Sequence, residues 1–194
     1  MSDTSAAHDT YEEVPYPCHP FRQTHPDRLA TIGILFGLEP PPIDRCRVLE
    51  IGCARGENLV PMAEQLPGSQ FLGLDRSPAQ IKAANDFAAR AGLTNVEFRE
   101  GNILDFGADL GTFDYIVSHG VFSWVPPAVQ DKMLDLCATY LSPNGIAYIS
   151  YNTFPGWHMR AMIRDMMCYH TSRFQEPEKC IQQARGLLAF LRSE

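Results

Sequence analysis

The sequence predicts an α/β domain built on a doubly wound parallel sheet. Five short apolar segments alternate with helical segments through the middle of the chain. This alternation is typical of parallel sheets, whose strands are buried on both faces and connected by crossover helices. A turn rich in small residues follows the first apolar segment, where such folds bind ligands. With 194 residues, the chain can form one well-buried core with additional helices.

Each expected strand is an apolar run that ends next to glycine or polar residues. In chain order, the five strands are Arg47–Ile51, Gln70–Leu74, Val96–Glu100, Phe113–Ser118 and Ile146–Tyr151. No strand candidate follows the fifth. We therefore expect a core over residues 45–152, preceded by an N-terminal cap segment with a helix (1–44) and followed by a helical segment (153–194).

Helix signals lie between and around these strands. Ser77 is a cap, Pro78 suits the first helical position and Gln80 completes a capping box. Apolar spacing predicts further helices, and the one from Pro126 should stop at Ser142–Gly145. These further helices are His25–Leu38, Pro126–Tyr140, Met159–His170 and Cys180–Leu191.

Composition limits the function classes. The 16 basic and 23 acidic side chains give a net charge of −7, which disfavours nucleic acid as a partner. No apolar run approaches the roughly 20 residues of a membrane helix, and no leader-like pattern opens the chain, so we expect a cytoplasmic protein without membrane contact. The six cysteines lack metal-site or paired spacing, which predicts free thiols and no metal.

The most specific segment is the turn after the first strand. Gly52 and Gly56 leave space where the backbone turns sharply and a ligand approaches the main chain. A dinucleotide fingerprint would read G-x-G-x-x-G, whereas this turn has Cys53 and Ala54 after its first glycine and Glu50 two positions before it.

Two further segments follow the second and third strands. Asp75, with Arg76 after it, is placed to accept hydrogen bonds from both hydroxyls of a ribose. Asn102 can bond the edge of an adenine ring, and Ile103 can cover the face of that ring. A structural reading, in which the glycines only form a turn and Asp75 only caps a helix, explains each motif alone but not their order.

Together these motifs resemble class I S-adenosylmethionine-dependent methyltransferases, which have a Rossmann-like fold, over residues 45–152. The resemblance implies S-adenosylmethionine as cofactor. The methionine end of the cofactor would be held by Glu50 and by the turn with Gly52, Cys53, Ala54 and Gly56. Its ribose would be held by Asp75 and Arg76, and its adenine by Asn102 and Ile103. The chain departs from the family at Ala54, where a glycine is usual.

Candidate acceptor residues follow the fourth and fifth strands at the same edge. His119 is a candidate for contacting the cofactor and accepting a proton, and Tyr151 for orienting an amine. Trp124, Asn152 and Trp157 add rings and polar groups for acceptor binding. The alternative is that the histidine and both tryptophans only contribute to packing.

Several segments outside the core are similar to bacterial methyltransferases that carry a methyltransferase regulatory domain, a group that includes the rickettsial protein lysine methyltransferases. The similarity covers Tyr11–Pro17, Thr24–Ala30, Gly120–Pro126 and Tyr151–His158. It implies that Tyr11 and His25 line or cover the site, with plain packing as the alternative, and it makes protein lysine a candidate acceptor. The open alternatives are a small-molecule acceptor, a non-catalytic cofactor-binding regulatory module and, more remotely, a nicotinamide-dependent oxidoreductase.

Class I methyltransferases also have a sixth and a seventh strand beside the fifth. This chain shows neither, so we expect a sheet that lacks the last two strands and ends in an exposed edge. We expect either a second copy of the chain or a C-terminal region of the same protein to cover that edge.

Overall fold

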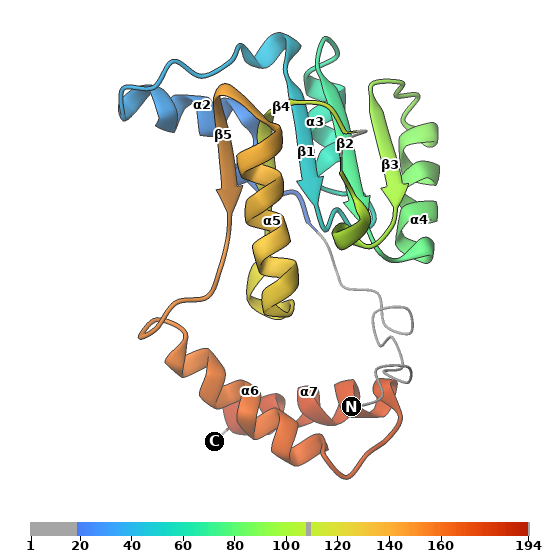
Figure 1. Cartoon of the computed structure of the whole chain (residues 1–194). Coiled ribbons are helices and arrows are strands. Elements are labelled where there is room, and N and C mark those ends of the chain that lie inside the picture. The colour runs from blue at the N-terminus through green and yellow to red at the C-terminus, as the bar shows by residue number, and fades with distance from the viewer. Residues whose placement is uncertain (1–18, 108–109, 194) are drawn as a thin grey trace. The chain divides into compact units, whose positions relative to one another are not determined.

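The computed structural model describes residues 19–107 and 110–193. The chain divides into two compact units, one containing Pro17–Tyr151 and the other containing Asn152–Glu194. The first unit holds the sheet and its covering helices (Figure 1). The described part of the second unit, residues 152–193, contains the helices α6 (His158–Thr171) and α7 (Pro177–Ser193).

All five strands of the first unit run parallel. Their spatial order is β3-β2-β1-β4-β5, so the chain starts in the middle of the sheet and winds outward in both directions. This order confirms the predicted doubly wound α/β fold. The strands are β1 (Arg47–Ile51), β2 (Gln70–Asp75), β3 (Val96–Glu100), β4 (Phe113–Ser118) and β5 (Leu141–Ile149).

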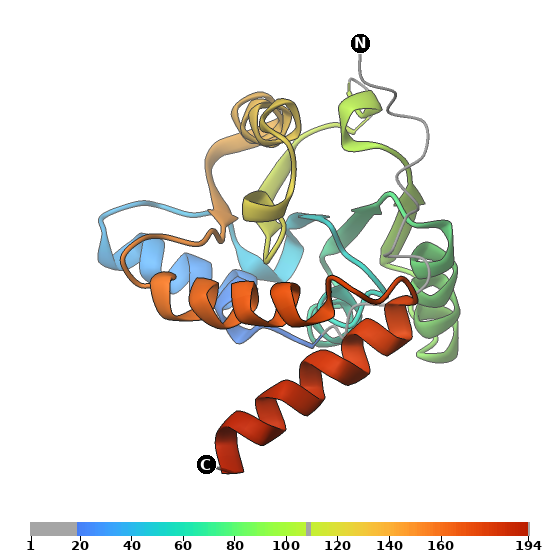
Figure 2. The ribbon, with the colours of Figure 1, turned by 90° about the horizontal axis from the view of Figure 1, so that it is seen from below.

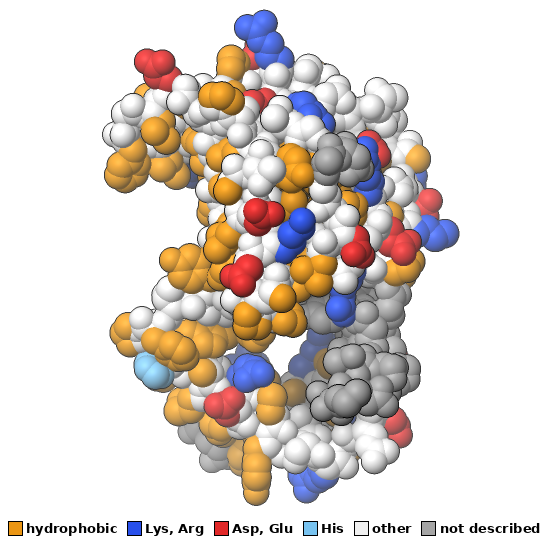
Figure 3. Space-filling view, in the orientation of Figure 1, with side chains coloured by type: hydrophobic (Ala, Val, Ile, Leu, Met, Phe, Trp, Pro, Cys, Tyr) orange, Lys and Arg blue, Asp and Glu red, His pale blue; other side chains and the backbone are white. Residues whose placement is uncertain are grey.

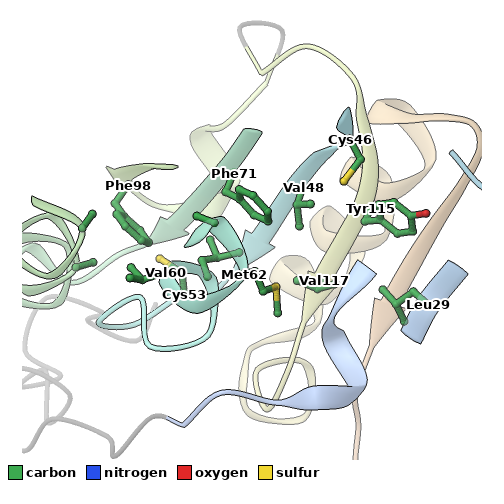
Figure 4. Packing of buried hydrophobic residues seen from close by; sticks show 14 of the residues in the cluster. Leu29, Cys46, Val48, Cys53, Val60, Met62, Phe71, Phe98, Tyr115 and Val117 are labelled. Atoms are coloured by element: carbon green, nitrogen blue, oxygen red, sulfur yellow. The ribbon is translucent and has the colours of Figure 1, made fainter. Parts of the chain in front are cut away.

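Helices cover both faces of this sheet (Figure 2). On one face lie α2 (Pro26–Leu35), α3 (Leu59–Gln65) and α4 (Pro78–Arg90). On the other face, α5 (Pro127–Tyr140) packs through Met133, Leu136 and Cys137. Figure 4 shows the first of these two cores, in which Val48, Phe71 and Tyr115 from three neighbouring strands point towards the helices.

Short 3-10 turns complete the unit at its loops. They are η1 (Arg22–Thr24), η2 (Ile43–Arg45), η3 (Ile103–Asp105) and η4 (Phe122–Trp124).

The N-terminal helix is shorter than predicted, because α2 ends at Leu35 and not at Leu38. Gly37 has φ +83°, and the Leu38 N–H donates to the Gly33 carbonyl, which closes the helix with a left-handed residue. The helix also belongs to the same compact unit as the sheet. Its Gly33 leaves the space into which Ile146 of β5 fits, since a Cβ at Gly33 would lie 2.8 Å from the Ile146 Cδ1.

The fifth strand also differs from its prediction. It begins directly after α5, at Leu141, and the residues 142–145 that were expected to end the helix form a bulge within the strand. Leu141 pairs with Phe113 and Ile146 with Tyr115, so the β5 side contains three extra residues between these pairs. Asn144, with φ +63°, takes the left-handed conformation of the bulge.

Two of the three helix signals at α4 are confirmed. Gln80 does not complete a capping box, because the Ser77 N–H donates to Asp75 and the Gln80 Oε1 is buried without a partner in the described chain. The Gln80 N–H donates to the Ser77 hydroxyl at 3.2 Å, and Pro78 opens the helix. In the described part of α6 and α7, no residue is buried, and the two helices contact each other. Among residues 19–107 and 110–193, no helix is both long and apolar enough to span a bilayer.

Candidate functional site

The site lies where the winding of the sheet reverses, between the carboxyl ends of β1 and β4. Loops leave these two neighbouring strands towards opposite faces of the sheet, so a crevice opens between them. The Ser118 hydroxyl at the end of β4 donates to the Ile51 carbonyl at the end of β1, at 3.0 Å. This bond holds the two strand ends together beneath the loops.

The turn after β1 has three residues in the left-handed region. Gly52, Ala54 and Gly56 have φ values of +78°, +47° and +75°. A Cβ at Gly52 would lie 2.5 Å from the Val121 side chain, and one at Gly56 would lie 2.7 Å from the Phe98 ring. Both glycines are therefore required by close packing as well as by conformation.

The positive φ of Ala54 explains why a glycine is usual at this position in the family. An L-residue other than glycine in the left-handed region costs about 1 kcal/mol or more. The Ala54 N–H, however, donates to the Asp75 carboxylate at 2.9 Å, and this bond holds the turn in place. The turn therefore keeps its conformation despite the substitution.

Asp75 ends β2 and connects the two neighbouring loops. One of its oxygens accepts the bond from Ala54, and the other accepts from the Ser77 N–H at 3.0 Å. A carboxylate has about four acceptor positions, so each oxygen can accept one more hydrogen bond. The two hydroxyls of a ribose fit these remaining positions.

Glu50 is a buried carboxyl at this edge, with 3% of its surface exposed. Its Oε1 accepts a hydrogen bond from the Asn58 amide at 2.7 Å, while its Oε2 is buried without a partner. Burial raises the pKa of Glu50 to about 8; the Asn58 bond lowers it, and the charge of Asp75 raises it. A buried oxygen with unused acceptor capacity suits a cationic ligand group such as an ammonium.

Asn58 is the hub of a hydrogen-bond network around Glu50. Its amide nitrogen also donates to the Thr24 hydroxyl at 3.0 Å, and its oxygen accepts from the Phe21 N–H at 2.8 Å. Asn58 was not among the site residues predicted from the sequence. Its position just before α3, at the end of the glycine-containing turn after β1, was the available signal.

His119 follows β4 at the same edge. Its Nδ1 lies 3.1 Å from the Tyr148 hydroxyl, and its ring lies 4.0 Å from the Phe21 ring, measured between centroids. Burial lowers the pKa of His119, so its imidazole is neutral at neutral pH. Tyr148, on β5, was also not selected from the sequence, because an aromatic residue within a strand usually indicates core packing.

Residues 43–185 match the methyltransferase domain family. The chain belongs to this family. That membership confirms the resemblance drawn from the motifs at Glu50, Asp75 and Asn102.

Similar proteins come from Rickettsia. The structure of PKMT2 from Rickettsia typhi in complex with AdoHcy is 47% identical, with a TM-score of 0.80, over 93% of this chain and 34% of that one. Two uncharacterized proteins of Rickettsia prowazekii are each 48% identical to this chain. The match to the first covers 97% of this chain and 34% of that protein. The match to the second covers 94% of this chain and 73% of that protein. This methyltransferase domain thus spans about a third of PKMT2 and of the longer of these proteins.

The residues predicted to contact adenine, Asn102 and Ile103, follow β3 in the structure. The Asn102 oxygen accepts from the Leu104 N–H at 3.1 Å and so starts η3. The Asn102 side chain is exposed, and Ile103 is partly buried against the α5 core. Arg76 is exposed beside Asp75. Cys53, at 1% exposure, belongs to the hydrophobic core, so only its backbone can face a cofactor.

Aromatic acceptor candidates of the first unit stand at the same edge. Trp124 is 49% exposed and Tyr151 is 64% exposed. The Tyr151 ring lies 6.2 Å from that of Phe122, at an interplanar angle of 58°. Phe122 and Trp124 share the turn η4, so the loop after β4 and the end of the β5 segment supply apolar surface together.

The remaining candidates are His25, Asn152, Trp157 and Tyr11. His25 caps α2 by accepting from the Asp27 N–H at 3.2 Å, and its contact with an acceptor stays a prediction. Asn152 and Trp157 belong to the second unit. Tyr11 lies outside the described residues. Within the described ranges, no cluster of three or more metal-ligating side chains occurs.

Proposed function

We propose that this domain transfers a methyl group from S-adenosylmethionine to the side-chain nitrogen of a protein lysine. Family membership supports S-adenosylmethionine as the cofactor. The observation that carries the proposal is the pair of carboxyls at the switch point. Glu50 has a buried oxygen without a partner, and Asp75 has acceptor capacity left over after organising the turn.

The described residues fit the groups of this cofactor. Glu50 would hold its ammonium, Asp75 its ribose, and Asn102 with Ile103 its adenine. When bound, the cofactor supplies a methyl group activated by a positively charged sulfur. The positive φ values and tight packing of Gly52 and Gly56 let the backbone approach it closely.

Lysine as the acceptor is supported by the similarity to PKMT2 of Rickettsia typhi and by the neutral His119. A lysine ammonium must become an amine before its nitrogen can attack a methyl carbon. The nitrogen then gains the methyl group, S-adenosylhomocysteine is left, and the one proton released can pass to His119. The exposed rings of Trp124 and Tyr151 suit an alkylammonium side chain entering from an open surface.

Calorimetry tests cofactor binding. S-adenosylmethionine should bind the wild-type chain, and Asp75→Ala should weaken binding roughly 100-fold, because two hydrogen bonds to a charged acceptor are lost. Asp86→Ala, at an exposed aspartate of α4, is the matched control and should bind like wild type. Equal affinity in Asp75→Ala would place the cofactor elsewhere.

Transfer of labelled methyl groups tests the acceptor. A lysine-rich protein should be labelled, and the same protein with its lysines acetylated should not, because an amide nitrogen is not nucleophilic. Labelling that is unchanged by this blocking would exclude lysine as the acceptor. Labelling of small-molecule amines only would favour the small-molecule alternative.

The edge strand β5 supports a proposal about partners. In the described residues, β5 pairs only with β4. Figure 3 shows apolar side chains on the surface at the end of α2, where Ile34, Leu35 and Phe36 are exposed. We propose that another segment covers this edge, from a second copy or from further residues of the same protein. A monomeric mass by light scattering would contradict the second copy.

The cysteines bear on the proposed compartment. The five described cysteines are free thiols, which supports the cytoplasm because its reducing conditions keep thiols free.

A further inference from the structure

We propose that Asn58 is a positioning residue that aims the free oxygen of Glu50 at the cofactor's ammonium and couples this contact to the docking of residues 21–24. This inference rests on the proposed function, because it concerns how the cofactor is held. It adds a side chain and a chain segment that are not part of the three sequence motifs.

Geometry at Glu50 supports the first half of the proposal. The Asn58 amide nitrogen lies 2.7 Å from the Glu50 Oε1, and both side chains are buried, at 1% and 3% exposure. A carboxylate held through one oxygen presents its other oxygen in a fixed direction. That other oxygen, Oε2, has no partner within the described chain. Asn58 therefore determines where the unpaired acceptor points.

The second half rests on the other side of the same amide group. The Asn58 oxygen accepts from the Phe21 N–H at 2.8 Å, and the Thr24 hydroxyl lies within 3.3 Å of both polar atoms of the amide. Thr24 is fully buried. Residues 21–24, called here the strap, are thus fixed to the residue that holds Glu50.

The strap also contacts the second functional group of the site. The Phe21 ring packs against His119, the candidate proton acceptor. A single short segment therefore contacts both the Glu50–Asn58 network and His119. Binding of the ammonium at Glu50 should stabilise Asn58 and the strap, and hence the position of Phe21 against His119.

A truncated ligand separates this role from a general structural one. S-adenosylmethionine contains the ammonium, whereas 5′-methylthioadenosine keeps the adenosine and sulfur but lacks the amino acid. Calorimetry should measure both ligands with wild type, Asn58→Leu, Glu50→Gln and the double variant. Asn85→Leu, at an exposed asparagine of α4, is the matched control.

We expect Asn58→Leu to weaken S-adenosylmethionine about tenfold or more and to leave 5′-methylthioadenosine within about twofold. In the Glu50→Gln background, the same substitution should have little further effect, because Asn58 acts through Glu50. Equal weakening of both ligands, or additive effects of the two substitutions, would overturn the inference and leave the proposed function intact. Failure of wild type to bind S-adenosylmethionine would overturn both.

A measurement on wild type keeps the test decisive if Asn58→Leu does not fold. Hydrogen exchange of the Phe21 amide, which donates to Asn58, should slow when S-adenosylmethionine is added and not when 5′-methylthioadenosine is added. Thr24→Val, which removes only the strap's hydroxyl, should reduce this slowing. An exchange rate that responds equally to both ligands would show that the strap does not sense the ammonium.

Discussion

At the amino edge of the sheet, buried polar side chains are paired with the backbone, whereas at the carboxyl edge a buried carboxyl keeps an unpaired oxygen. Asn95, before β3, donates to the carbonyls of Ala63, Leu66 and Ser69 at 3.0–3.2 Å. Ser69, before β2, accepts from the Cys46 N–H and donates to the Ile43 carbonyl. These bonds connect loops and give stability.

The carboxyl edge has the opposite character. Glu50, Glu57 and Gln80 each have one buried side-chain oxygen without a hydrogen-bond partner in the described chain. Ala54 has a positive φ at the same edge. Unpaired polar atoms and backbone strain cost stability, and they are found where a protein is organised to bind something. Within one sheet, the amino edge therefore contributes stability, and the carboxyl edge is organised for binding.

The largest effect on stability is expected at the amino edge. Asn95→Leu removes the donor to three carbonyls in the core and should destabilise the domain by about 4 kcal/mol, at about 1–3 kcal/mol per unpaired group. Urea unfolding followed by circular dichroism measures this loss. The folded fraction should keep its affinity for S-adenosylmethionine. Asn85→Leu, at an exposed site, should change stability by less than about 0.5 kcal/mol. If Asn85→Leu destabilised the domain as much as Asn95→Leu does, the hydrogen bonds of Asn95 would not be the source of stability at the amino edge.

The carboxyl edge should respond to Glu50→Gln in the opposite direction. Because the pKa of Glu50 is raised from 4.5 to about 8, folding of the ligand-free domain favours its protonated form. This contribution is present below pH 4.5 and is lost as the pH rises towards 8, so Glu50→Gln should stabilise the domain by about 4 kcal/mol at pH 8 and by little at pH 4.5. Unfolding at both pH values, with the exposed Glu64→Gln as control, tests this. A destabilised Glu50→Gln at pH 8 would contradict it.

Cofactor affinity should depend on pH through the same group. Holding an ammonium requires ionised Glu50, so binding below pH 8 releases a proton. Affinity should rise by up to about tenfold from pH 6.5 to pH 7.5. Calorimetry in buffers of different ionisation enthalpy counts the proton. A release that persists in Glu50→Gln would assign the proton to another residue.

The smallest effect is expected at Ala54. Glycine there removes the strain of a positive φ, which is worth about 1 kcal/mol, but adds flexibility to the unfolded chain, at about 0.5–1 kcal/mol. Thermal unfolding should therefore show a change of less than about 1 kcal/mol, with cofactor binding retained. Loss of binding in Ala54→Gly would mean that the alanine side chain itself contributes to the site.

All five strands could be located from the sequence, because apolar runs between glycine and proline signals reflect local preferences and burial. The start of the fifth strand was misplaced, because the Pro143-Asn144-Gly145 segment suits both a turn and a bulge. Only the pairing with β4 decides between them. The same reasoning found Glu50 and Asp75, since their places follow from strand ends.

The sequence by itself determined the parallel α/β class, the order of the cofactor motifs and the residues at the strand ends, because these depend on local composition and on short spacings along the chain. Only the tertiary structure decided that Asn58 joins Glu50 to Thr24 and Phe21, and that Tyr148 meets His119. These partners lie 8 to 37 residues apart. Their contacts depend on how the chain closes over the sheet edge, and no local pattern encodes that closure.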